Sequence, residues 1–464
     1  MLRIVSLVFK YPTMKTILIL GAGLSSNMLI RYFLDKASAQ NLHIRIGDIS
    51  HAVAAAKIDG CANCSAFEFD VYNESQCNAE IVKADIVISM LPARMHPIVA
   101  RTCIKQSKNM VTASYAGKEI HSMDREAREK GVLLMNECGV DPGIDHMSAM
   151  QVINRIRSKG IDLIAFESST GGLVAPGFEN NPWQYKFTWN PRNVVLAGKD
   201  GARFLHNGKF KYIPYHKLFS RIETITIPDL GEFEIYGNRD SLIYRETYGL
   251  HHLETMFRGT IRRPGFSKAW DIFVQLGATD DSYIMEHTDQ MTYREFINSF
   301  IAYRIDIPVE EKLSLYLNIP MESKMMQRLK WLGIFENRKI GVPGLTPAQV
   351  LQKILEQKWS LEPGDKDMIV MAHQFDYIDS NQRKKIYSTF KYVGKDNYHT
   401  AMAATVGLPV AIVANLILQG KVNLTGVQLP IIPEIYEPVL KELRRMQFEF
   451  IEEEVLVPPD KESL

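Results

Sequence analysis

Short apolar runs alternate with helix-like segments through the first third of the chain. Lys15–Leu20 is almost continuously apolar, the pattern of a parallel strand buried on both faces, and Asn27–Lys36 follows it at helical spacing. This alternation predicts an α/β fold in which helices cover both faces of a parallel sheet. Further strands of that sheet are expected at Leu42–Ile46, Ala66–Phe69, Ala84–Leu91, Met110–Ala113 and Val132–Met135.

Beyond Ile161 the pattern changes to strands separated by loops, and later to helices. Aromatic residues at positions 183, 185, 187 and 189 alternate with polar residues, which predicts a strand within Asn180–Arg192. Other strands are expected at Leu163–Ser169, Glu223–Ile227, Glu232–Tyr236, Ile369–Tyr377 and Lys385–Lys391. Helices are expected through most of Thr292–Gln357, and at His399–Leu418 and Ile435–Phe448.

The chain has 464 residues, more than the roughly 250–300 at which one hydrophobic core stops growing, so two or three domains are expected. Lys and Arg number 54 against 53 Asp and Glu, and the formal net charge of +1 argues against nucleic acid as a partner. The most apolar window, Ala401–Leu418, contains Pro409 and Asn415 and falls short of the ~20 residues that span a bilayer. We therefore expect no membrane segment, and we interpret residues 1–13 as an extension ahead of the first strand.

The five cysteines are sparse for a chain of this length, which favours a reducing, cytoplasmic setting over a disulfide framework. Cys61 and Cys64 have CxxC spacing, but no second CxxC or histidine pair follows at the distance that a zinc site needs. We therefore expect a loop with two thiols at this place, and no metal site.

A glycine-rich turn, Gly21-Ala22-Gly23-Leu24-Ser25-Ser26, follows the first strand and opens the first helix. The first glycine suits a tight turn, the second lets a pyrophosphate approach the backbone, and the helix N-terminus supplies N–H groups. Asp48 follows the second strand, where an acid binds the ribose 2′-hydroxyl and repels a 2′-phosphate. The pattern favours NAD, while Arg45 nearby leaves NADP open and an ordinary loop acid is the alternative for Asp48.

Ligands of open parallel sheets bind at the carboxyl ends of the strands. Leu91, Ser114 and Tyr115 fall at such ends, although a Ser-Tyr pair there is also common for purely structural reasons. His96 precedes Pro97, and we interpret it as the residue that opens a helix rather than as a catalytic group.

The stretch Asn136–Met147, NECGVDPGIDHM, separates the α/β pattern from the rest of the chain. Proline fixes its own φ and restricts the residue before it, while glycine permits positive φ. Asp141-Pro142-Gly143 should therefore form a rigid turn that holds Asp141 in one orientation. From the residues alone the turn is either a domain boundary or a site, and we interpret Asp145 and His146 as the start of a helix.

Two later loops carry arginines, Gly237–Ser241 and Arg258–Arg263. A guanidinium group binds a carboxylate bidentately, so two such loops beside a nucleotide fold suit a substrate with several carboxylates. Solvated loop arginines are the alternative.

Several segments occur in an order known from one family: HPIVARTCI with NMVTASY (His96–Tyr115), ECGVDPGIDHM (Glu137–Met147), GGLVAPGFENNPWQYKFTWNPR (Gly171–Arg192), GNRDS (Gly237–Ser241), RGTIRRPGF (Arg258–Phe266), TVGLPVAIVA (Thr405–Ala414) and EIYEPVL (Glu434–Leu440). Together they make the chain resemble the glutamate-forming saccharopine dehydrogenases, also called saccharopine reductases. The resemblance implies three domains: a Rossmann NAD(P)-binding domain at 14–140 completed by 395–455, a saccharopine-binding α/β domain at 141–285 with 365–394, and an inserted helical subdomain at 286–364.

The resemblance also implies which residues form the site. Arg239 and Arg262 would hold carboxylates, while Asp141 with Tyr115 would hold the amine and transfer protons. Fungal members resemble NADP enzymes with a basic residue after the second strand, where this chain has Asp48. Cofactor contacts would be Gly21, Gly23, Leu24, Ser25, Asp48, Leu91, Ala113 and Ser114, and saccharopine contacts would be Ser114, Tyr115, Asp141, Arg239, Thr260, Ile261 and Arg262.

The implied reaction belongs to lysine metabolism and uses NAD or NADP. Saccharopine, a secondary amine with three carboxylates, would lose a hydride from the carbon beside its nitrogen, and the resulting imine would take up water and break into glutamate and 2-aminoadipate 6-semialdehyde. A related opine-type enzyme (carboxynorspermidine dehydrogenase or lysine 6-dehydrogenase) and a catalytically silent NAD-binding protein are the alternatives. Exposed helices leave a homodimer open.

Overall fold

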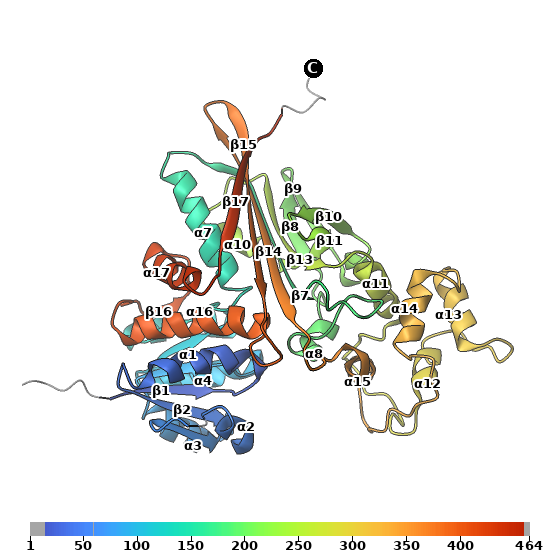
Figure 1. Cartoon of the computed structure of the whole chain (residues 1–464), viewed down its shortest axis with the longest axis horizontal. Coiled ribbons are helices and arrows are strands. Elements are labelled where there is room, and N and C mark those ends of the chain that lie inside the picture. The colour runs from blue at the N-terminus through green and yellow to red at the C-terminus, as the bar shows by residue number, and fades with distance from the viewer. Residues whose placement is uncertain (1–13, 59, 459–464) are drawn as a thin grey trace, which may run out of the picture. The chain divides into compact units, whose positions relative to one another are not determined.

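The computed structural model describes residues 14–58 and 60–458 (Figure 1), so the extension expected at residues 1–13 lies outside the described residues. The chain divides into two compact units. The first consists of the residues up to Gln151 together with Ala403–Gln447, and the second of Val152–Met402 together with the chain from Phe448 onward.

A seven-stranded parallel sheet forms the first unit, in the order β16-β6-β5-β4-β1-β2-β3. The order 3-2-1-4-5-6 is that of a Rossmann fold, and β16 adds a seventh strand beside β6. The parallel sheet predicted from the apolar runs is therefore confirmed. Its strands are β1 (Lys15–Leu20), β2 (Leu42–Asp48), β3 (Cys64–Glu68), β4 (Ile86–Ser89), β5 (Asn109–Thr112), β6 (Leu133–Met135) and β16 (Gly426–Gln428).

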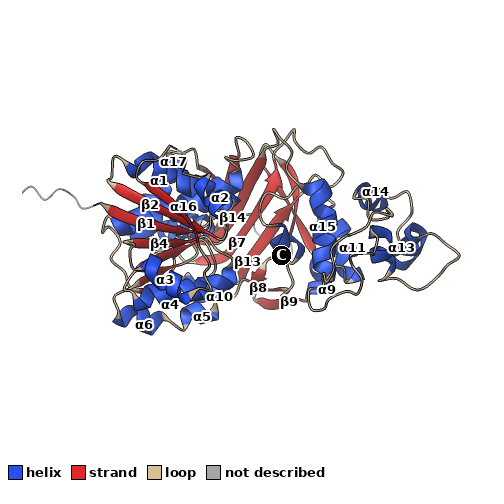
Figure 2. Ribbon diagram, turned by 90° about the horizontal axis from the view of Figure 1, so that it is seen from below, coloured by secondary structure: helices blue, strands red, loops and turns tan. Residues whose placement is uncertain are grey.

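Helices cover both faces of this sheet, with α1, α16 and α17 on one face and α3, α4 and α6 on the other (Figure 2). The central strands are covered completely, since Ile17, Leu18, Ile86 and Val87 have no exposed surface. The helices are η1 (Leu24–Ser26), α1 (Asn27–Ala37), α2 (His51–Ala55), α3 (Glu74–Ile81), η2 (Ala93–Met95), α4 (His96–Lys105), α5 (Lys118–His121), α6 (Asp124–Glu129) and α17 (Pro433–Arg444). Two more helices are shared with the other unit: α7 (Ile144–Arg157) starts in this unit and ends in the other, and α16 (Ala401–Leu418) has its first two residues in the other.

The helix α16 is long and apolar enough to cross a membrane by length and composition alone. However, 89% of its apolar window is buried inside the protein. That degree of burial is typical of a core helix.

The second unit is built on a ten-stranded mixed sheet. Its main path runs β10-β11-β13-β7-β14-β15-β17; β8 pairs with β13, and β9 and β12 each pair with β8. β7 and β13 are parallel, whereas the other neighbours along the main path are antiparallel. The strands are β7 (Leu163–Val174), β8 (Ala202–His206), β9 (Lys209–Ile213), β10 (Ile222–Ile227), β11 (Gly231–Gly237), β12 (Arg239–Asp240), β13 (Thr255–Arg262), β14 (Asp367–Asp379), β15 (Gln382–Val393) and β17 (Phe450–Leu456).

The helices α12 to α15 lie together to one side of this sheet (Figure 1), and α13, α14 and α15 are also on that side in the second view (Figure 2). Their buried side chains, such as Phe296 and Trp359, belong to the same hydrophobic cluster as Phe233 and Ile261 of the sheet. The helical segment 286–364 thus shares the core of the second unit, and its separation as an inserted subdomain stays a prediction. The helices of this unit are α8 (Pro191–Val195), α9 (Tyr215–Leu218), α10 (Ile243–Thr247), α11 (Phe266–Leu276), α12 (Tyr293–Asn298), α13 (Val309–Leu317), α14 (Lys324–Trp331) and α15 (Pro347–Trp359).

The strand predicted within Asn180–Arg192 is wrong, because this segment forms an irregular buried loop that leads into α8. The Asn181 side chain accepts a hydrogen bond from Trp183 N and donates one to the Tyr185 carbonyl. Both aromatic rings pack against Trp359. Alternate burial therefore arises here without a partner strand, since local side-chain bonds satisfy the backbone instead.

Candidate active site

The glycine-rich turn after β1 has the shape that a dinucleotide requires. Gly21 has φ of +99°, and a Cβ at this position would lie 2.8 Å from the Met90 carbonyl oxygen. A Cβ at Gly23 would meet no atom within 4 Å. The backbone at Gly21 thus leaves no room for a side chain, whereas the backbone at Gly23 faces open space. The next residue, Leu24, is exposed and begins η1. A pyrophosphate fits against this open backbone and the N-terminus of the following helix.

Asp48 links the end of β2 to this turn. One carboxylate oxygen accepts from Ala22 N at 2.7 Å, and the other accepts from Ser50 N at 3.0 Å. The Lys57 ammonium donates to Asn27 Oδ1 at the start of α1, at 2.5 Å. Burial lowers the pKa of Lys57, and the negative charge of Asp48 acts in the opposite direction. The glycine turn is therefore bordered by the Asp48 carboxylate and by the Lys57 ammonium group, which interact electrostatically.

Arg45, the basic residue that left NADP open, is engaged elsewhere. Its guanidinium forms an ion pair of 2.5 Å with Glu80 and lies over the ring of Phe67. The positive charge that interacts with Asp48 comes instead from Lys57, which lies three residues past the buried Ala54 of α2. The sequence pattern did not identify Lys57 as a candidate.

The predicted residues Leu91, Ala113 and Ser114 all follow the ends of β4 and β5, as expected. His96 opens α4 with proline in the first turn, which confirms that interpretation. Its imidazole has a second role, because Nδ1 lies 2.8 Å from Ser89 Oγ and Nε2 lies 2.7 Å from Ser114 Oγ. Burial lowers the pKa of His96 to about 4, so the ring is neutral near pH 7.

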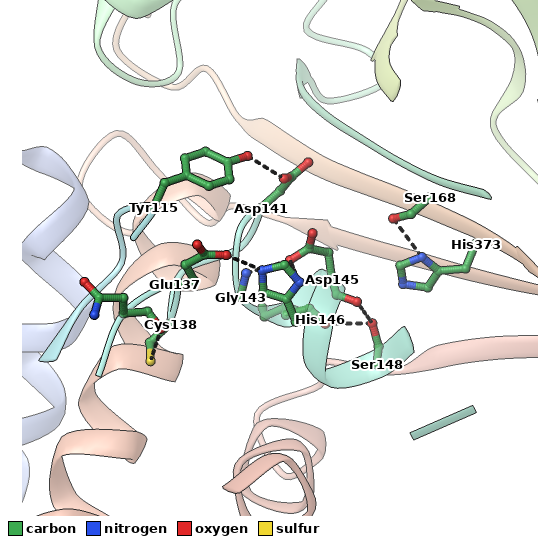
Figure 3. Close-up of polar contacts among 12 residues, drawn as sticks. Tyr115, Glu137, Cys138, Asp141, Gly143, Asp145, His146, Ser148, Ser168 and His373 are labelled. Atoms are coloured by element: carbon green, nitrogen blue, oxygen red, sulfur yellow. Dashed lines mark hydrogen bonds and ion pairs between the residues drawn. The ribbon is translucent and has the colours of Figure 1, made fainter. Parts of the chain in front are cut away.

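Asp141 and Tyr115 lie together, as Figure 3 shows, with Tyr115 Oη donating to Asp141 Oδ1 at 3.3 Å. The rigid turn predicted around Asp141 is confirmed. Gly139 N donates to the Pro142 carbonyl at 2.9 Å, and the Asp141-Pro142 peptide bond is cis. At Gly143, with φ of +149°, a Cβ would lie 2.0 Å from the Gly139 carbonyl oxygen. Two close backbone segments therefore hold Asp141 at the carboxyl end of the sheet.

Glu137 connects the two loops that carry Tyr115 and Asp141. One carboxylate oxygen accepts from Ala116 N at 3.0 Å, and the other lies 2.7 Å from His146 Nε2 (Figure 3). Asp145 accepts from Gly143 N at 2.6 Å at the start of α7, so its interpretation as a helix-start residue is confirmed. His146 also lies in the first turn of α7, but its buried pairing with Glu137 was missed. The sequence hinted at this pairing only by placing a glutamate and a histidine in the same short motif as Asp141.

The remaining predicted residues lie in the second unit. Arg239 is exposed in β12 and has φ of +55°. Thr260, Ile261 and Arg262 end β13, where Arg262 is 5% exposed and its guanidinium lies over the rings of Tyr185 and Phe266.

The Arg262 guanidinium lacks an acidic partner among the described residues. Its Nη1 donates to the Ile261 carbonyl at 2.9 Å, and its buried Nε has no hydrogen-bond partner within residues 14–58 and 60–458. Neighbouring Arg263, by contrast, pairs with Glu179 at 2.6 Å. A buried cation without a counter-ion is unfavourable unless an anion joins it, so Arg262 suits a ligand carboxylate.

The expectation of two thiols at positions 61 and 64 is wrong. Cys61 and Cys64 form a disulfide, with Cα atoms 5.4 Å apart. A turn at Ala62-Asn63 separates the two cysteines and leads directly into β3, and the distance between their Cα atoms is within the range that a disulfide needs. Within residues 14–58 and 60–458, no cluster of three or more His, Cys, Asp or Glu side chains could hold a metal ion.

Two family descriptions match the chain. Residues 17–135 match the saccharopine dehydrogenase NADP binding domain, and residues 139–448 match the saccharopine dehydrogenase C-terminal domain. The first range covers strands β1 to β6, so the first unit is an NAD(P)-binding domain of an oxidoreductase family.

Relatives that match along almost the whole of this chain agree with these family matches. The chain is 31% identical over 455 residues to the NADP(+), L-glutamate-forming saccharopine dehydrogenase of Schizosaccharomyces pombe, which covers 95% of this chain and 100% of the relative. It is 31% identical over 444 residues to the mitochondrial alpha-aminoadipic semialdehyde synthase of Bos taurus, covering 93% of this chain and 47% of the relative. The solved apo structure of the L-glutamate-forming saccharopine dehydrogenase from Saccharomyces cerevisiae superposes with a TM-score of 0.85 at 28% identity, over 95% of this chain and 100% of that one. This chain therefore belongs to the family of L-glutamate-forming saccharopine dehydrogenases.

Proposed function

We propose that the protein interconverts saccharopine, NAD(P)+ and water with L-glutamate, 2-aminoadipate 6-semialdehyde and NAD(P)H, as a cytoplasmic enzyme of lysine metabolism. One observation carries this proposal. The paired Tyr115 and Asp141 lie at the carboxyl end of the same parallel sheet whose glycine turn forms a dinucleotide cradle. The family membership supports it, because relatives that match along their full length are named for this activity.

A bound nicotinamide supplies the redox chemistry, and the protein's own residues must manage protons and charge. The secondary amine of saccharopine must be unprotonated before its neighbouring carbon can be oxidised. We assign Asp141 to this step, because its carboxylate is half-buried and can accept a hydrogen bond from an ammonium group. The Tyr115 hydroxyl fixes the orientation of that carboxylate through its hydrogen bond.

The three substrate carboxylates need cationic partners, and we assign Arg239 and Arg262 to them. Arg262 is supported by its burial without an acidic partner among the described residues. Diamine substrates of the opine-type alternatives carry fewer carboxylates, so two arginines favour saccharopine over them.

NAD is the cofactor that we favour, because Asp48 ends β2 with both oxygens turned toward the glycine turn and the following loop. An acid at this position repels a 2′-phosphate. Lys57 offsets part of that charge and keeps NADP usable, in agreement with the NADP(+) in the names of the fungal relatives.

Steady-state assays with saccharopine, run in parallel with NAD and NADP, test the proposal. We expect turnover with both cofactors and a higher kcat/KM with NAD. A diamine or lysine substrate that outcompetes saccharopine would assign the protein to the opine-type alternatives. Tight NADH binding without turnover of any amino-acid substrate would make it a silent NAD-binding protein. Titration with 5′-AMP and 2′,5′-ADP would report the choice of cofactor independently of activity.

A further inference from the structure

The side chains of Ser89, His96 and Ser114 form a continuous hydrogen-bonded row in the first unit. Ser89 ends β4, His96 begins α4, and Ser114 follows the neighbouring strand β5. Ser89 has no exposed surface and His96 is 3% exposed, whereas Ser114 is half-buried. The row is therefore closed to ligands at Ser89 and accessible at Ser114.

The closed end of the row determines which imidazole nitrogen carries the hydrogen. A neutral imidazole has one N–H donor and one acceptor nitrogen. Among the described residues, the Ser89 hydroxyl has only His96 Nδ1 as an acceptor. Since a buried hydroxyl without an acceptor is strongly unfavourable, Ser89 donates to Nδ1. The hydrogen of the neutral ring is consequently on Nε2, and this assignment follows from the network rather than from observed hydrogens.

Because Nε2 carries a hydrogen, the Ser114 hydroxyl group accepts a hydrogen bond from the ring instead of donating one to it. At 2.7 Å the N–H bond of His96 occupies one lone pair of Ser114 Oγ. Thr112 Oγ1 lies 3.5 Å from Nε2, too far for a normal hydrogen bond from its hydroxyl group, so it does not compete with the shorter contacts of the two serines, and it accepts from the Ser114 backbone N at 3.3 Å. The Ser114 hydroxyl hydrogen is then directed away from the ring, toward the accessible side.

We infer that His96 is a positioning residue that makes Ser114 a hydrogen-bond donor toward a carboxylate of the substrate. The inference rests on the proposed function, because it names the group on an amino-acid substrate that Ser114 would bind. With the opposite tautomer, Ser114 would present a lone pair and repel a carboxylate. The low pKa that burial gives His96, about 4, keeps this arrangement unchanged around pH 7.

Nitrogen NMR of the protein labelled with ¹⁵N-histidine tests the tautomer directly. The His96 signals are those missing from the spectrum of the His96→Gln variant. We expect a hydrogen on Nε2, an unprotonated Nδ1, and no titration between pH 6 and 8. A hydrogen on Nδ1, or an imidazolium in this range, would overturn the inference. This measurement needs no turnover, so its failure is distinct from a failure of the proposed function.

Kinetics of three variants test the consequence for substrate binding. His96→Phe keeps the ring shape without a donor and should raise the KM for saccharopine about tenfold, because a hydrogen bond to a charged group is lost. Ser114→Ala should raise the KM by a similar factor, and the double variant should be no worse than Ser114→Ala, since both changes remove one interaction. Glutamine places an amide nitrogen near the position of Nε2, so His96→Gln should restore most of the affinity.

A matched control is His43→Gln, which alters another histidine–serine contact of the same unit, the 3.4 Å contact with Ser65 Oγ. It should leave the KM for saccharopine unchanged, and the kcat of the two His96 variants should stay within about threefold of the original if the role of His96 is positioning. An unchanged KM in His96→Phe, or fully additive effects in the double variant, would contradict the inference.

Discussion

The carboxylate of Glu137 lies 2.7 Å from Nε2 of His146, and both side chains are buried. The other oxygen of Glu137 accepts from Ala116 N, next to Tyr115. A single carboxylate thus ties the loop after β5 to the first turn of α7. Tyr115 lies next to Ala116 in the loop after β5, and Asp141 lies in the turn between Glu137 and α7, so this connection supports the pairing of Tyr115 with Asp141.

Replacing Glu137 with alanine should therefore weaken both the fold and the reaction. Ala116 N and His146 each lose an acceptor, so we expect the free energy of unfolding to fall by about 2–4 kcal/mol. Thermal unfolding of the variant measures this loss. Glu129→Ala, at an exposed ion pair of 3.8 Å on α6, is the control and should change stability by less than about 0.5 kcal/mol. Equal stability of the two variants would contradict the connecting role of Glu137.

Gly143→Ala should prevent the Asp141 turn from forming. A Cβ at this position would lie 2.0 Å from the Gly139 carbonyl oxygen, and no shift of a flexible side chain can relieve a backbone contact. We expect little soluble protein, or a loss of several kcal/mol in stability. Gly131→Ala is the matched control, since Gly131 also has positive φ, +65°, but open space around it. That control should cost only about 1 kcal/mol.

Asp141→Asn should lower kcat for saccharopine oxidation about 100-fold, because the amide cannot accept a proton from the substrate amine. Tyr115→Phe should have a smaller effect, about tenfold, since it removes only a hydrogen bond that orients the carboxylate. NADH affinity, measured by fluorescence titration, should stay the same in both. Asp70→Asn, an exposed acid after β3, serves as the control. A kcat unaffected by Asp141→Asn would remove Asp141 from the proton-transfer role.

Arg239→Ala should raise the KM for saccharopine by about 10- to 100-fold while leaving NAD binding nearly intact, because a bidentate carboxylate contact is lost. Arg203→Ala is a suitable control, since Arg203 is an exposed arginine on β8, the strand beside β12, and pairs with Asp240. An unchanged KM in the Arg239 variant, or an equal rise in both variants, would contradict a specific carboxylate contact by Arg239.

Asp367 should contribute a pH-dependent term to stability. Its carboxylate accepts from Ala401 N and Met402 N at the start of α16, and burial raises its pKa to about 6 from an ordinary value of 3.8. The folded state therefore binds the proton more tightly than the unfolded state. This stabilisation is present below pH 3.8 and is lost as pH rises to about 6, a change on the order of 2–3 kcal/mol.

Thermal midpoints measured from pH 4 to 7.5 would show this term. Asp367→Asn should flatten the decline between about pH 4 and 6. The decline of the thermal midpoint above pH 6 should remain in this variant, because burial also raises the pKa of Glu167, to about 7. Identical pH profiles for the variant and the original protein would contradict the assignment.

The parts of the structure that the sequence predicted well rest on strong local signals. The run Lys15–Leu20 and the glycine turn after it are determined by burial and by backbone clearance, both of which are visible in residue types. The rigid turn at Asp141 was likewise predictable from proline and glycine. The loop around Trp183 was not, because its aromatic residues are buried alternately by partners such as Trp359, far away in sequence.

Sequence reasoning correctly placed Leu91, Ala113 and Ser114 after strand ends, and it missed the contacts that depend on a partner in another part of the fold. His96, Glu137 and His146 owe their positions to contacts with residues on other elements. The same holds for Cys61 and Cys64, whose bridge depends on a turn that their spacing alone does not specify. Pairings of this kind depend on the folded backbone, so no periodicity in the chain reveals them.

The late strands β16 and β17 have a consequence for how the chain is made. β16 pairs with β6, and β17 pairs with β15, so the last stretch of described residues completes both sheets. During translation, neither sheet can be completed before these residues have left the ribosome, and until then β6 and β15 keep unpaired edges that favour association with other chains. Nascent or truncated chains lacking residues 426–456 should therefore depend on chaperones, and the first 150 residues should not yield a stable dinucleotide-binding unit on their own.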